Sequence, residues 1–269
     1  MTEFQRDSHE TRFDHDLELA RAFTRTAGAF ERAPVQSDPL ALERLVAFTA
    51  APPNSLILDA GCGPGLVAEA FLEAGHRVVG IDLAEGMIGL ARERCARFGD
   101  AAEFLVGSIH DDLPPGLQSF DVAVSRFVVH HVLEPRRFLA RQRDLLRAGG
   151  ILMCCDHTTD TDPFRAEWHN EVDIARDQTH TRNLSPGQLL DLLASLGLER
   201  LGMQEEPYLL DFEEWFARGH TTRTREEVLG QIVQGPGARG FTVVSPPGAN
   251  VLIRSWRSLV RGIRPGLST

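Results

Sequence analysis

The chain has 269 residues, of which 42% are hydrophobic and 25% charged, and its 28 basic and 38 acidic residues give a net charge of −10. This size and balance are typical of one large or two small globular domains, and the acidic balance argues against nucleic-acid binding, because phosphates are neutralised by clustered basic side chains. All 28 basic residues are arginine, which excludes a lysine Schiff base, a phosphate-loop lysine and a catalytic ammonium group.

Residues 1–50 are predicted to form an N-terminal helical cap. Apolar residues at helical spacing from Leu17 to Phe30 predict one helix, which Pro34 ends, and the polar residues 1–15 before it are expected to fray. Asp38 followed by Pro39 is typical of the start of a second helix, which continues to Thr49.

From residue 55 onwards, short apolar runs alternate with helical patterns. The runs are non-alternating, as in strands buried on both faces, and they are Leu56–Leu58, Arg77–Ile81, Phe104–Val106, Val122–Val124 and Ile151–Cys155. Helical spacing lies between them, over residues 87–98 and 138–146. This alternation predicts a parallel sheet with helices on both faces over residues 51–159, with ligands bound beyond the carboxyl ends of the strands.

After residue 160 the pattern predicts a mostly helical lid and then a return to the sheet. Helices are expected over residues 163–178, 185–197, 211–218 and 223–234, and a strand over residues 198–210. Residues 160–236 are therefore interpreted as a helical lid, or substrate region, that contains one core strand. Residues 240–256 predict a hairpin with its turn at residues 245–248, so that residues 237–269 complete the sheet.

A glycine-rich loop, Leu58–Gly65 with the sequence LDAGCGPG, lies between the first strand and the next helix. Its glycines permit a tight turn and a close approach of backbone to ligand. The spacing differs from a dinucleotide motif, whose third glycine would fall at Leu66. Asp59 would also face an anionic pyrophosphate, so its carboxylate favours a cationic ligand without phosphate, such as S-adenosylmethionine. Alternatively, Asp59 only ties down the loop.

The ends of the next three strands add further contacts. Asp82 can accept hydrogen bonds from both ribose hydroxyls, and Ile109 can cover an adenine. Arg126 is placed to meet either the cofactor or a substrate carboxylate, while Ile109 and Met87 are equally typical of plain core. The residues predicted to contact the cofactor are Asp59, Gly61, Cys62, Gly63, Gly65, Asp82, Leu83, Met87, Ser108, Ile109 and Arg126.

Taken together, these motifs resemble those of class I S-adenosylmethionine-dependent methyltransferases. The segments that carry the resemblance are LDAGCGPG, GIDL, SFDVAVSR, HHVLEP and LLRAGGIL. The flanking FTRTAGAFERAP and ARDQTHTRNLS segments resemble the ubiquinone- and menaquinone-type small-molecule branch, although Ser108 replaces the usual Asp and Thr26 the usual Gln. The resemblance implies an α/β fold with a Rossmann-like, doubly wound, mostly parallel seven-stranded sheet. It also implies a C-terminal antiparallel hairpin, the N-terminal helical cap and the inserted helical lid.

Three histidines are candidate general bases, because imidazole titrates near neutral pH: His131, His157 and His180. His180 could instead serve only as a hydrogen-bonding residue of the lid, and one histidine of the His130–His131 pair could hydrogen-bond neighbouring backbone. Residues predicted to contact the substrate are Phe23, Phe30, His131, Trp168 and His180, although aromatic residues at helical spacing are also typical of core. The adjacent His130 and His131 diverge and cannot chelate one ion alone, so we expect no metal.

The sequence therefore predicts an S-adenosylmethionine-dependent methyltransferase acting on a small hydrophobic or aromatic molecule of quinone-like or secondary metabolism. It leaves open the acceptor, the choice between O-, N- and C-methylation, the use of a base and the oligomeric state, and it is compatible with a homodimer. The alternatives are cyclisation or elimination on the same fold, or a non-catalytic binding protein. With no apolar run near ~18 residues, no secretory signal and no Cys-x-x-Cys spacing, we expect a cytoplasmic protein with no membrane partner.

Overall fold

The structure, a computed structural model, describes residues 3–111, 113–114, 117, 119–245 and 250–266. Its elements in chain order are α1 (Glu3–Arg32), α2 (Pro34–Ser37), α3 (Pro39–Thr49), β1 (Leu56–Ala60), α4 (Leu66–Glu73), β2 (Arg77–Asp82), α5 (Glu85–Cys95), η1 (Ala96–Ala101), β3 (Ala102–Val106), β4 (Phe120–Arg126), η2 (Val129–His131), α6 (Pro135–Leu145), β5 (Leu146–Thr158), α7 (Pro163–Arg176), α8 (Pro186–Ser195), β6 (Glu199–Asp211), α9 (Phe212–Ala217), α10 (Arg225–Gln234), β7 (Thr242–Val243) and β8 (Leu252–Ile263). Each strand expected from an apolar run is present, and most extend a few residues beyond it.

The strands form one sheet in the order β3-β2-β1-β4-β5-β8-β6. The pairings from β3 to β5 are parallel, whereas β8 runs antiparallel to both β5 and β6. The Rossmann-like, mostly parallel sheet is therefore confirmed. The short β7 pairs with β8 as the predicted hairpin requires, and residues 246–249 of its turn lie outside the described residues.

Alternate residues of the central strands build two hydrophobic layers, one on each face of the sheet. Ile57 and Val122 point to the face covered by α4, where Phe71 is fully buried. Their neighbours Leu58 and Ala123 point to the face covered by α6 and α8. Burying one such large side chain contributes about 1.5–3 kcal/mol, which explains why these strands are continuously apolar.

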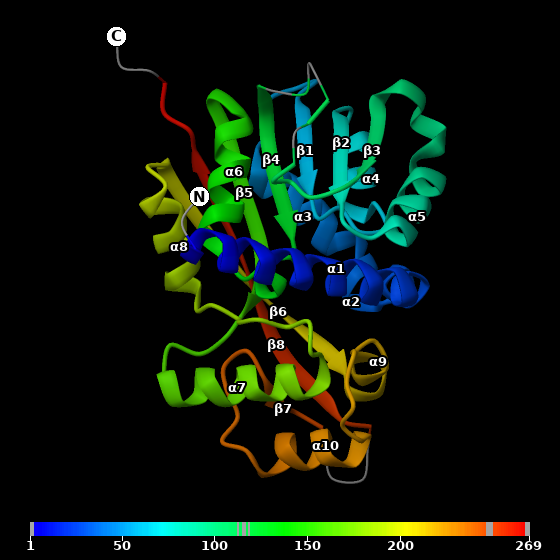
Figure 1. Cartoon of the computed structure of the whole chain (residues 1–269), viewed down its shortest axis with the longest axis vertical. Coiled ribbons are helices and arrows are strands. Elements are labelled where there is room, and N and C mark those ends of the chain that lie inside the picture. The colour runs from blue at the N-terminus through cyan, green and yellow to red at the C-terminus, as the bar shows by residue number, and fades with distance from the viewer. Residues whose placement is uncertain (1–2, 112, 115–116, 118, 246–249, 267–269) are drawn as a thin grey trace.

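The N-terminal helix lies across the carboxyl ends of the strands, between the sheet and the lid (Figure 1). It packs through Phe23 and Ala27 against Ala84 and Met87 at the start of α5. The helix α1 begins at Glu3, so it includes most of the residues that were expected to fray. Neither glycine nor proline, the two strongest helix breakers, occurs before Ala27.

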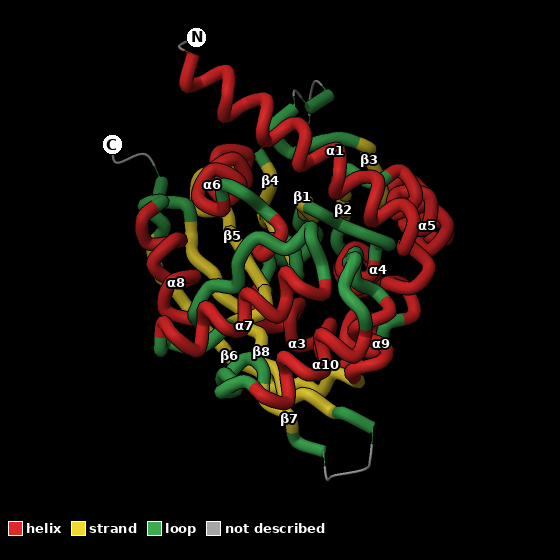
Figure 2. The backbone as a smooth tube through the Cα atoms, turned by 60° about the horizontal axis from the view of Figure 1, so that its bottom comes forward, coloured by secondary structure: helices red, strands yellow, loops and turns green. Residues whose placement is uncertain are grey.

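The lid forms a second small core beside the long, twisted end of the sheet. Figures 1 and 2 show α7, α9, α10 and β7 grouped around the ends of β6 and β8. Phe212, Trp215 and Phe241 are buried there against Ile253 of β8. The predicted boundaries near residues 50, 159 and 236 fall between elements, and the division into cap, core and lid stays a prediction. None of the helices in the described ranges combines the length and apolar character needed to cross a membrane.

Candidate active site

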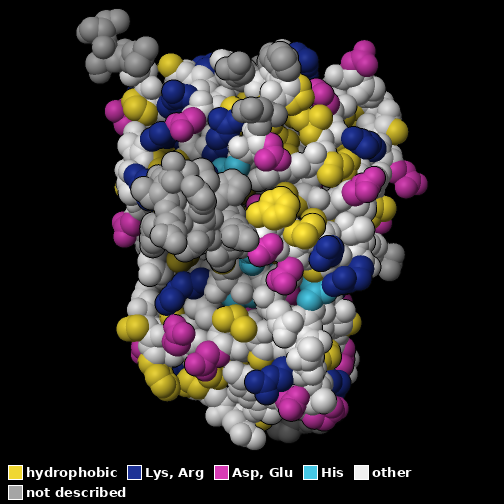
Figure 3. Space-filling view, in the orientation of Figure 1, with side chains coloured by type: hydrophobic (Ala, Val, Ile, Leu, Met, Phe, Trp, Pro, Cys, Tyr) yellow, Lys and Arg dark blue, Asp and Glu magenta, His cyan; other side chains and the backbone are white. Residues whose placement is uncertain are grey.

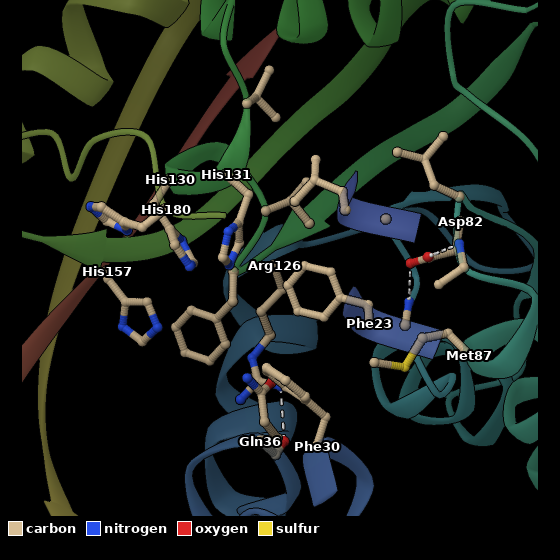
Figure 4. A pocket seen from close by; sticks show the side chains of 18 of the residues that line it. Phe23, Phe30, Gln36, Asp82, Met87, Arg126, His130, His131, His157 and His180 are labelled. Carbon is tan, nitrogen blue, oxygen red and sulfur yellow. Dashed lines mark hydrogen bonds between the residues drawn. The ribbon is translucent and has the colours of Figure 1, made fainter. Parts of the chain in front are cut away.

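A continuous cavity lies where the carboxyl ends of β1, β2, β4 and β5 meet α1 and the lid. Figure 4 shows Asp82 and Met87 on one side, Phe23 between, and on the other side a group of imidazoles, those of His130, His131, His157 and His180. On the outer surface, Figure 3 shows histidine side chains along the boundary between the sheet half and the lid half. The cavity therefore joins a glycine-loop end to an imidazole end.

Glycine at position 61 is required by both conformation and space. Gly61 has a φ of +75°, and a Cβ there would lie 2.6 Å from Val128 Cγ2. Gly63, with a φ of +52°, donates its N–H to Asp82 Oδ2 at 2.9 Å. The other oxygen, Asp82 Oδ1, accepts the N–H of Ala84 at 2.9 Å, so Asp82 fastens the loop to the end of β2. Carboxylate oxygens have further lone pairs, which leaves Asp82 able to accept from ribose hydroxyls.

Asp59 is the buried carboxylate at the end of β1, and only 1% of its surface is exposed. Its Oδ2 has no hydrogen-bond partner among the described residues, although the residue lines the cavity. Burial, with a smaller contribution from nearby Asp82, raises the pKa of Asp59 from 3.8 to about 7. An orphaned buried carboxylate oxygen fits a ligand that brings a positive charge, such as the ammonium group of S-adenosylmethionine.

Most of the residues predicted to contact the cofactor line this cavity. They are Asp59, Gly61, Cys62, Gly63, Asp82, Leu83, Met87, Ser108, Ile109 and Arg126. Gly65 is not among the residues that line the cavity, so its contact with the cofactor stays a prediction. This residue precedes α4, and a Cβ on it would lie 3.0 Å from the Ala91 backbone, so glycine there allows α4 and α5 to approach each other.

Arg126, at the end of β4, is engaged with the N-terminal cap. Its Nη1 donates to the carbonyl of Gln36 at 2.8 Å and its Nη2 to the carbonyl of Val35 at 2.9 Å. The guanidinium also lies 4.6 Å from the ring centroid of Phe127. Burial lowers the pKa of Arg126 to about 10, although the nearby carboxylates of Asp38 and Asp59 act in the opposite direction.

Directly after β4 the chain turns back through a strained residue. Phe127 has a φ of +58°, which is uncommon for a bulky side chain, and its N–H donates to the carbonyl of Cys155 at 2.8 Å. The turn brings His130 onto Asp156 of the neighbouring strand β5, with His130 Nδ1 2.5 Å from Asp156 Oδ1. Asp156 Oδ2 accepts the N–H of Val129 at 2.6 Å, which fixes the carboxylate.

The His130–Asp156 pair has the arrangement of a general base and its orienting carboxylate. A carboxylate can only accept, so Nδ1 of His130 carries the proton and Nε2 is the basic nitrogen. Nε2 makes no hydrogen bond to the described part of the chain, and His130 lines the cavity. Sequence reasoning did not single out His130 as a base. The sequence signal that could have found it is Asp156, an acidic residue directly after the apolar run of residues 151–155, together with the histidine pair that follows β4.

The three predicted candidate bases also line the cavity, each with one nitrogen engaged. His131 Nδ1 donates to the carbonyl of Thr179 at 3.0 Å, and His180 Nε2 donates to Asn170 Oδ1 at 3.2 Å. Nδ1 of His157 contacts the hydroxyl of Tyr208, and its ring stacks on Phe127.

Burial makes all three of these imidazoles weak bases. It lowers the pKa of His131 and His157 well below 6.5, and that of His180 to about 4. Their assignment as catalytic residues stays a prediction.

Among the residues predicted to contact the substrate, Phe23, Phe30, His131 and His180 line the cavity. Trp168 is not among the lining residues, so its contact with the substrate stays a prediction. Its ring packs against Phe241 and Ile232 in the lid core, while the next residue of α7, His169, faces the cavity. Consecutive residues on a helix point in different directions, and the sequence did not show which face of α7 turns inward.

Other cavity residues come from the lid and the far sheet edge, and sequence reasoning did not single them out for the site: Asp173, Arg176, Tyr208 and Arg218. Trp215, which the sequence offered as either a pocket or a core residue, lines the cavity as well. These residues come from α7, from β6, and from α9 and the residue that follows it. Among the described residues, no group of three or more His, Cys, Asp or Glu side chains could hold a metal ion.

Comparison with known proteins agrees with this geometry. Residues 58–154 match the family described as methyltransferase domain. The chain is 31% identical over 159 residues to a ubiquinone biosynthesis O-methyltransferase of Cereibacter sphaeroides, a match that covers 56% of this chain but only 64% of that relative.

Solved structures extend the likeness to most of the chain. A Bacillus halodurans protein described as a putative methyltransferase superposes with a TM-score of 0.74 at 25% identity, covering 84% of this chain and 99% of that one. The geranyl diphosphate C-methyltransferase of Streptomyces coelicolor, solved with S-adenosylhomocysteine, superposes with a TM-score of 0.56 at 15% identity, covering 84% and 79%, and shows the fold alone.

Proposed function

We propose that the chain is a class I S-adenosylmethionine-dependent methyltransferase and that it methylates a hydroxyl group of a small molecule. The observation that carries the choice of a hydroxyl is the His130–Asp156 pair. It lies at the carboxyl ends of β4 and β5 and faces the cavity that Asp59 and Asp82 also line.

The glycine-loop end fits the cofactor. Asp82 would hold the ribose hydroxyls, and the unpaired Oδ2 of Asp59 would receive the ammonium group. When bound, S-adenosylmethionine supplies an electrophilic methyl group, whose transfer to a hydroxyl leaves S-adenosylhomocysteine and one proton. Protein catalysis then consists of aligning the acceptor and taking up that proton.

His130 is placed to take up the proton. Its Nε2 is the unprotonated nitrogen, and Asp156 stabilises the imidazolium that forms when Nε2 becomes protonated. The buried His131, His157 and His180 have lowered pKa values and are therefore better suited to orienting an acceptor than to accepting its proton.

The imidazole end of the cavity suits a small aromatic acceptor. Phe23, Phe127, Trp215 and Phe241 supply aromatic walls between the imidazoles. Phe23 of α1 packs edge-on against His131, with ring centroids 5.0 Å apart, so the N-terminal cap covers this end as well. Covering the site excludes water from the reacting atoms.

The first test is formation of S-adenosylhomocysteine, followed by mass spectrometry at pH 8 with phenol, catechol, benzyl alcohol and benzylamine as probes. Methylation of the hydroxyl probes supports the proposal, whereas methylation of benzylamine alone contradicts it.

The second test compares His130→Gln and Asp156→Asn with His180→Gln. General-base catalysis contributes about 10²- to 10⁴-fold, so His130→Gln should lower kcat by that range. Asp156→Asn should lower kcat less and His180→Gln least, and the affinity for S-adenosylhomocysteine should change less than about threefold in each. A loss in His180→Gln that exceeds the loss in His130→Gln would assign the base to His180.

A direct measurement on the unliganded protein is nitrogen NMR of the histidine side chains. The proposal requires a protonated Nδ1 and an unprotonated Nε2 in neutral His130. The opposite tautomer would remove the basis for this assignment.

A further inference from the structure

Arg126 is a buried guanidinium that faces the cavity with no carboxylate partner. It is 8% exposed, and its two hydrogen bonds to the described part of the chain go to the main-chain carbonyls of Val35 and Gln36. Guanidinium has five N–H donors, so up to three more remain for a ligand. Carbonyl groups carry only partial charge, and a buried cation without an anion is destabilising.

The other arginines of the cavity wall each have a carboxylate partner. Arg176 pairs with Asp177 at 3.2 Å, and Arg218 pairs with Glu214 at 2.6 Å. Three guanidinium groups therefore line the same cavity, and Arg126 is the one without a carboxylate among the described residues.

Asp59, at the end of the neighbouring strand β1, is a buried carboxylate without an ion-pair partner among the described residues. β1 and β4 are parallel, with Asp59 paired to Val124, so Arg126 lies two residues further toward the carboxyl end, about 7 Å along the strand. Asp59 and Arg126 form no ion pair with each other, and both line the cavity. An unpaired buried anion and an unpaired buried cation on adjacent strands suit a ligand that carries both charges on one carbon atom, as an α-amino acid does.

We infer that Arg126 binds the carboxylate of the amino-acid end of S-adenosylmethionine while it holds the carbonyls of α2, so that cofactor binding draws the N-terminal cap onto the site. Figure 4 shows Arg126 hydrogen-bonded to Gln36 and lying beside Phe30, which is near the end of α1. The inference rests on the cofactor assignment and is independent of the proposed hydroxyl acceptor.

The coupling follows from the position of α2 within the cap. Val35 and Gln36 belong to α2, which only one residue separates from α1, and α1 supplies Phe23 and Phe30 to the cavity wall. A carboxylate that fixes the Arg126 guanidinium therefore also fixes the two carbonyls, and with them the end of α1. The cap should close more tightly with a ligand that has the carboxylate than with one that lacks it.

The binding test uses two ligands that differ by one group, S-adenosylhomocysteine and its decarboxylated analogue, in calorimetry without any methyl acceptor. The wild-type protein should bind S-adenosylhomocysteine about 10- to 100-fold more tightly than the analogue, as hydrogen bonds to a charged group imply. In Arg126→Gln this preference should fall to less than about threefold, while affinity for the analogue stays near the wild-type value. Retained analogue binding also shows that the variant is folded.

Arg218→Gln is the matched control, because Arg218 is a buried cavity arginine that already has a carboxylate partner. It should keep the wild-type preference for S-adenosylhomocysteine. A preference that persists unchanged in Arg126→Gln overturns the inference. The same result together with a raised KM confined to carboxylate-bearing acceptors would assign Arg126 to the substrate instead.

The second measurement is hydrogen exchange of the amides in residues 19–37. S-adenosylhomocysteine should slow exchange there in the wild-type protein, and the decarboxylated analogue should slow it much less. In Arg126→Gln the two ligands should give equal protection. Equal protection by both ligands in the wild-type protein would refute the coupling, even if Arg126 contributes to affinity. Neither measurement requires turnover, so failure of the hydroxyl proposal would leave both readouts intact.

Discussion

Replacing Asp59 by asparagine should stabilise the protein while weakening cofactor binding. The carboxylate is fully buried at the end of β1, and burial raises its pKa from 3.8 to about 7. In the unfolded chain the same group ionises with an ordinary pKa, so the folded protein holds an extra proton between these two pH values. The carboxylate therefore makes folding less favourable as the pH rises from 3.8 toward 7, and has no further effect above that.

The size of the effect follows from that interval. Each pH unit within it costs about 1.4 kcal/mol, which makes a total of about 4 kcal/mol at pH 8. The asparagine side chain of the variant cannot ionise, but its amide would place an N–H₂ group where Oδ2 of Asp59 now has no partner, at a cost of about 1–3 kcal/mol. We expect Asp59→Asn to raise the free energy of unfolding by about 1–3 kcal/mol at pH 8.

Urea unfolding at pH 5 and pH 8 tests this reasoning without knowledge of the amide cost. That cost does not depend on pH, so the gain from Asp59→Asn should be about 2–3 kcal/mol larger at pH 8 than at pH 5. Asp82→Asn is the contrasting variant, because both oxygens of Asp82 accept backbone N–H groups and the amide would face one of them. It should destabilise the protein at both pH values. An equal effect of Asp59→Asn at pH 5 and pH 8 would refute the raised pKa.

Binding should change in the opposite direction. In the proposed cofactor site the ionised form of Asp59 receives the ammonium group. On that proposal, the affinity of wild-type protein for S-adenosylhomocysteine should fall about tenfold for each pH unit below 7. In Asp59→Asn the affinity should be lower and nearly independent of pH over this range. Calorimetry between pH 5.5 and 8 measures both.

Three further predictions concern the loop, a helix start and the core. Gly61→Ala should abolish S-adenosylhomocysteine binding in calorimetry, since its Cβ would meet Val128 at 2.6 Å, whereas Gly63→Ala has open space at its Cβ and should cost only the strain of a positive φ, about 1–2 kcal/mol. Equal losses of binding would contradict this. Ser185→Ala removes the acceptor for the Gln188 N–H in a capping box and should lower the free energy of urea unfolding by about 1 kcal/mol. Phe71→Ala should lower it by about 3–5 kcal/mol because the ring is fully buried, and a loss below 1 kcal/mol would mean that the core is looser than the structure shows.

Most of the sheet could be predicted from the sequence because a single signal determined it. Short apolar runs separated by helical patterns can be placed only in a parallel sheet covered on both faces, and the LDAGCGPG loop fixed the end that binds ligand. The glycine-loop contacts are local in sequence, so Gly61, Gly63 and Asp82 could be assigned to the cavity from their spacing alone. Gly65 continues the same glycine spacing, but a Cβ on it would meet Ala91 of α5, so glycine there permits helix packing. The sequence could not show this because it does not give the position of α5.

The proposed base, His130, could not be chosen from the sequence because its contact with Asp156 depends on the register of two strands. Arg126 pairs with Cys155, so Asp156 projects one residue beyond the end of β4, and the turn at Phe127 determines which of the adjacent histidines meets it. Neither the register nor the sign of φ at a phenylalanine can be read from composition or periodicity. The sequence also does not show which face of α7 turns toward the cavity. For this reason Trp168 was predicted to contact the substrate, whereas its neighbour His169 lines the cavity.

The presence of buried charges without ion-pair partners distinguishes the carboxyl ends of β1 and β4 from the rest of the described fold. Away from the cavity the buried ion pair of the fold is matched: Arg257 lies 2.8 Å from Glu206. At the carboxyl ends of β1 and β4, by contrast, Asp59 and Arg126 are buried without ion-pair partners among the described residues. Leaving two opposite charges unpaired on adjacent strands lowers the stability of the free protein, and only a ligand with both complementary charges relieves both. The same two side chains should therefore account for a weakly stabilised free state and for a large rise in unfolding temperature when S-adenosylhomocysteine binds.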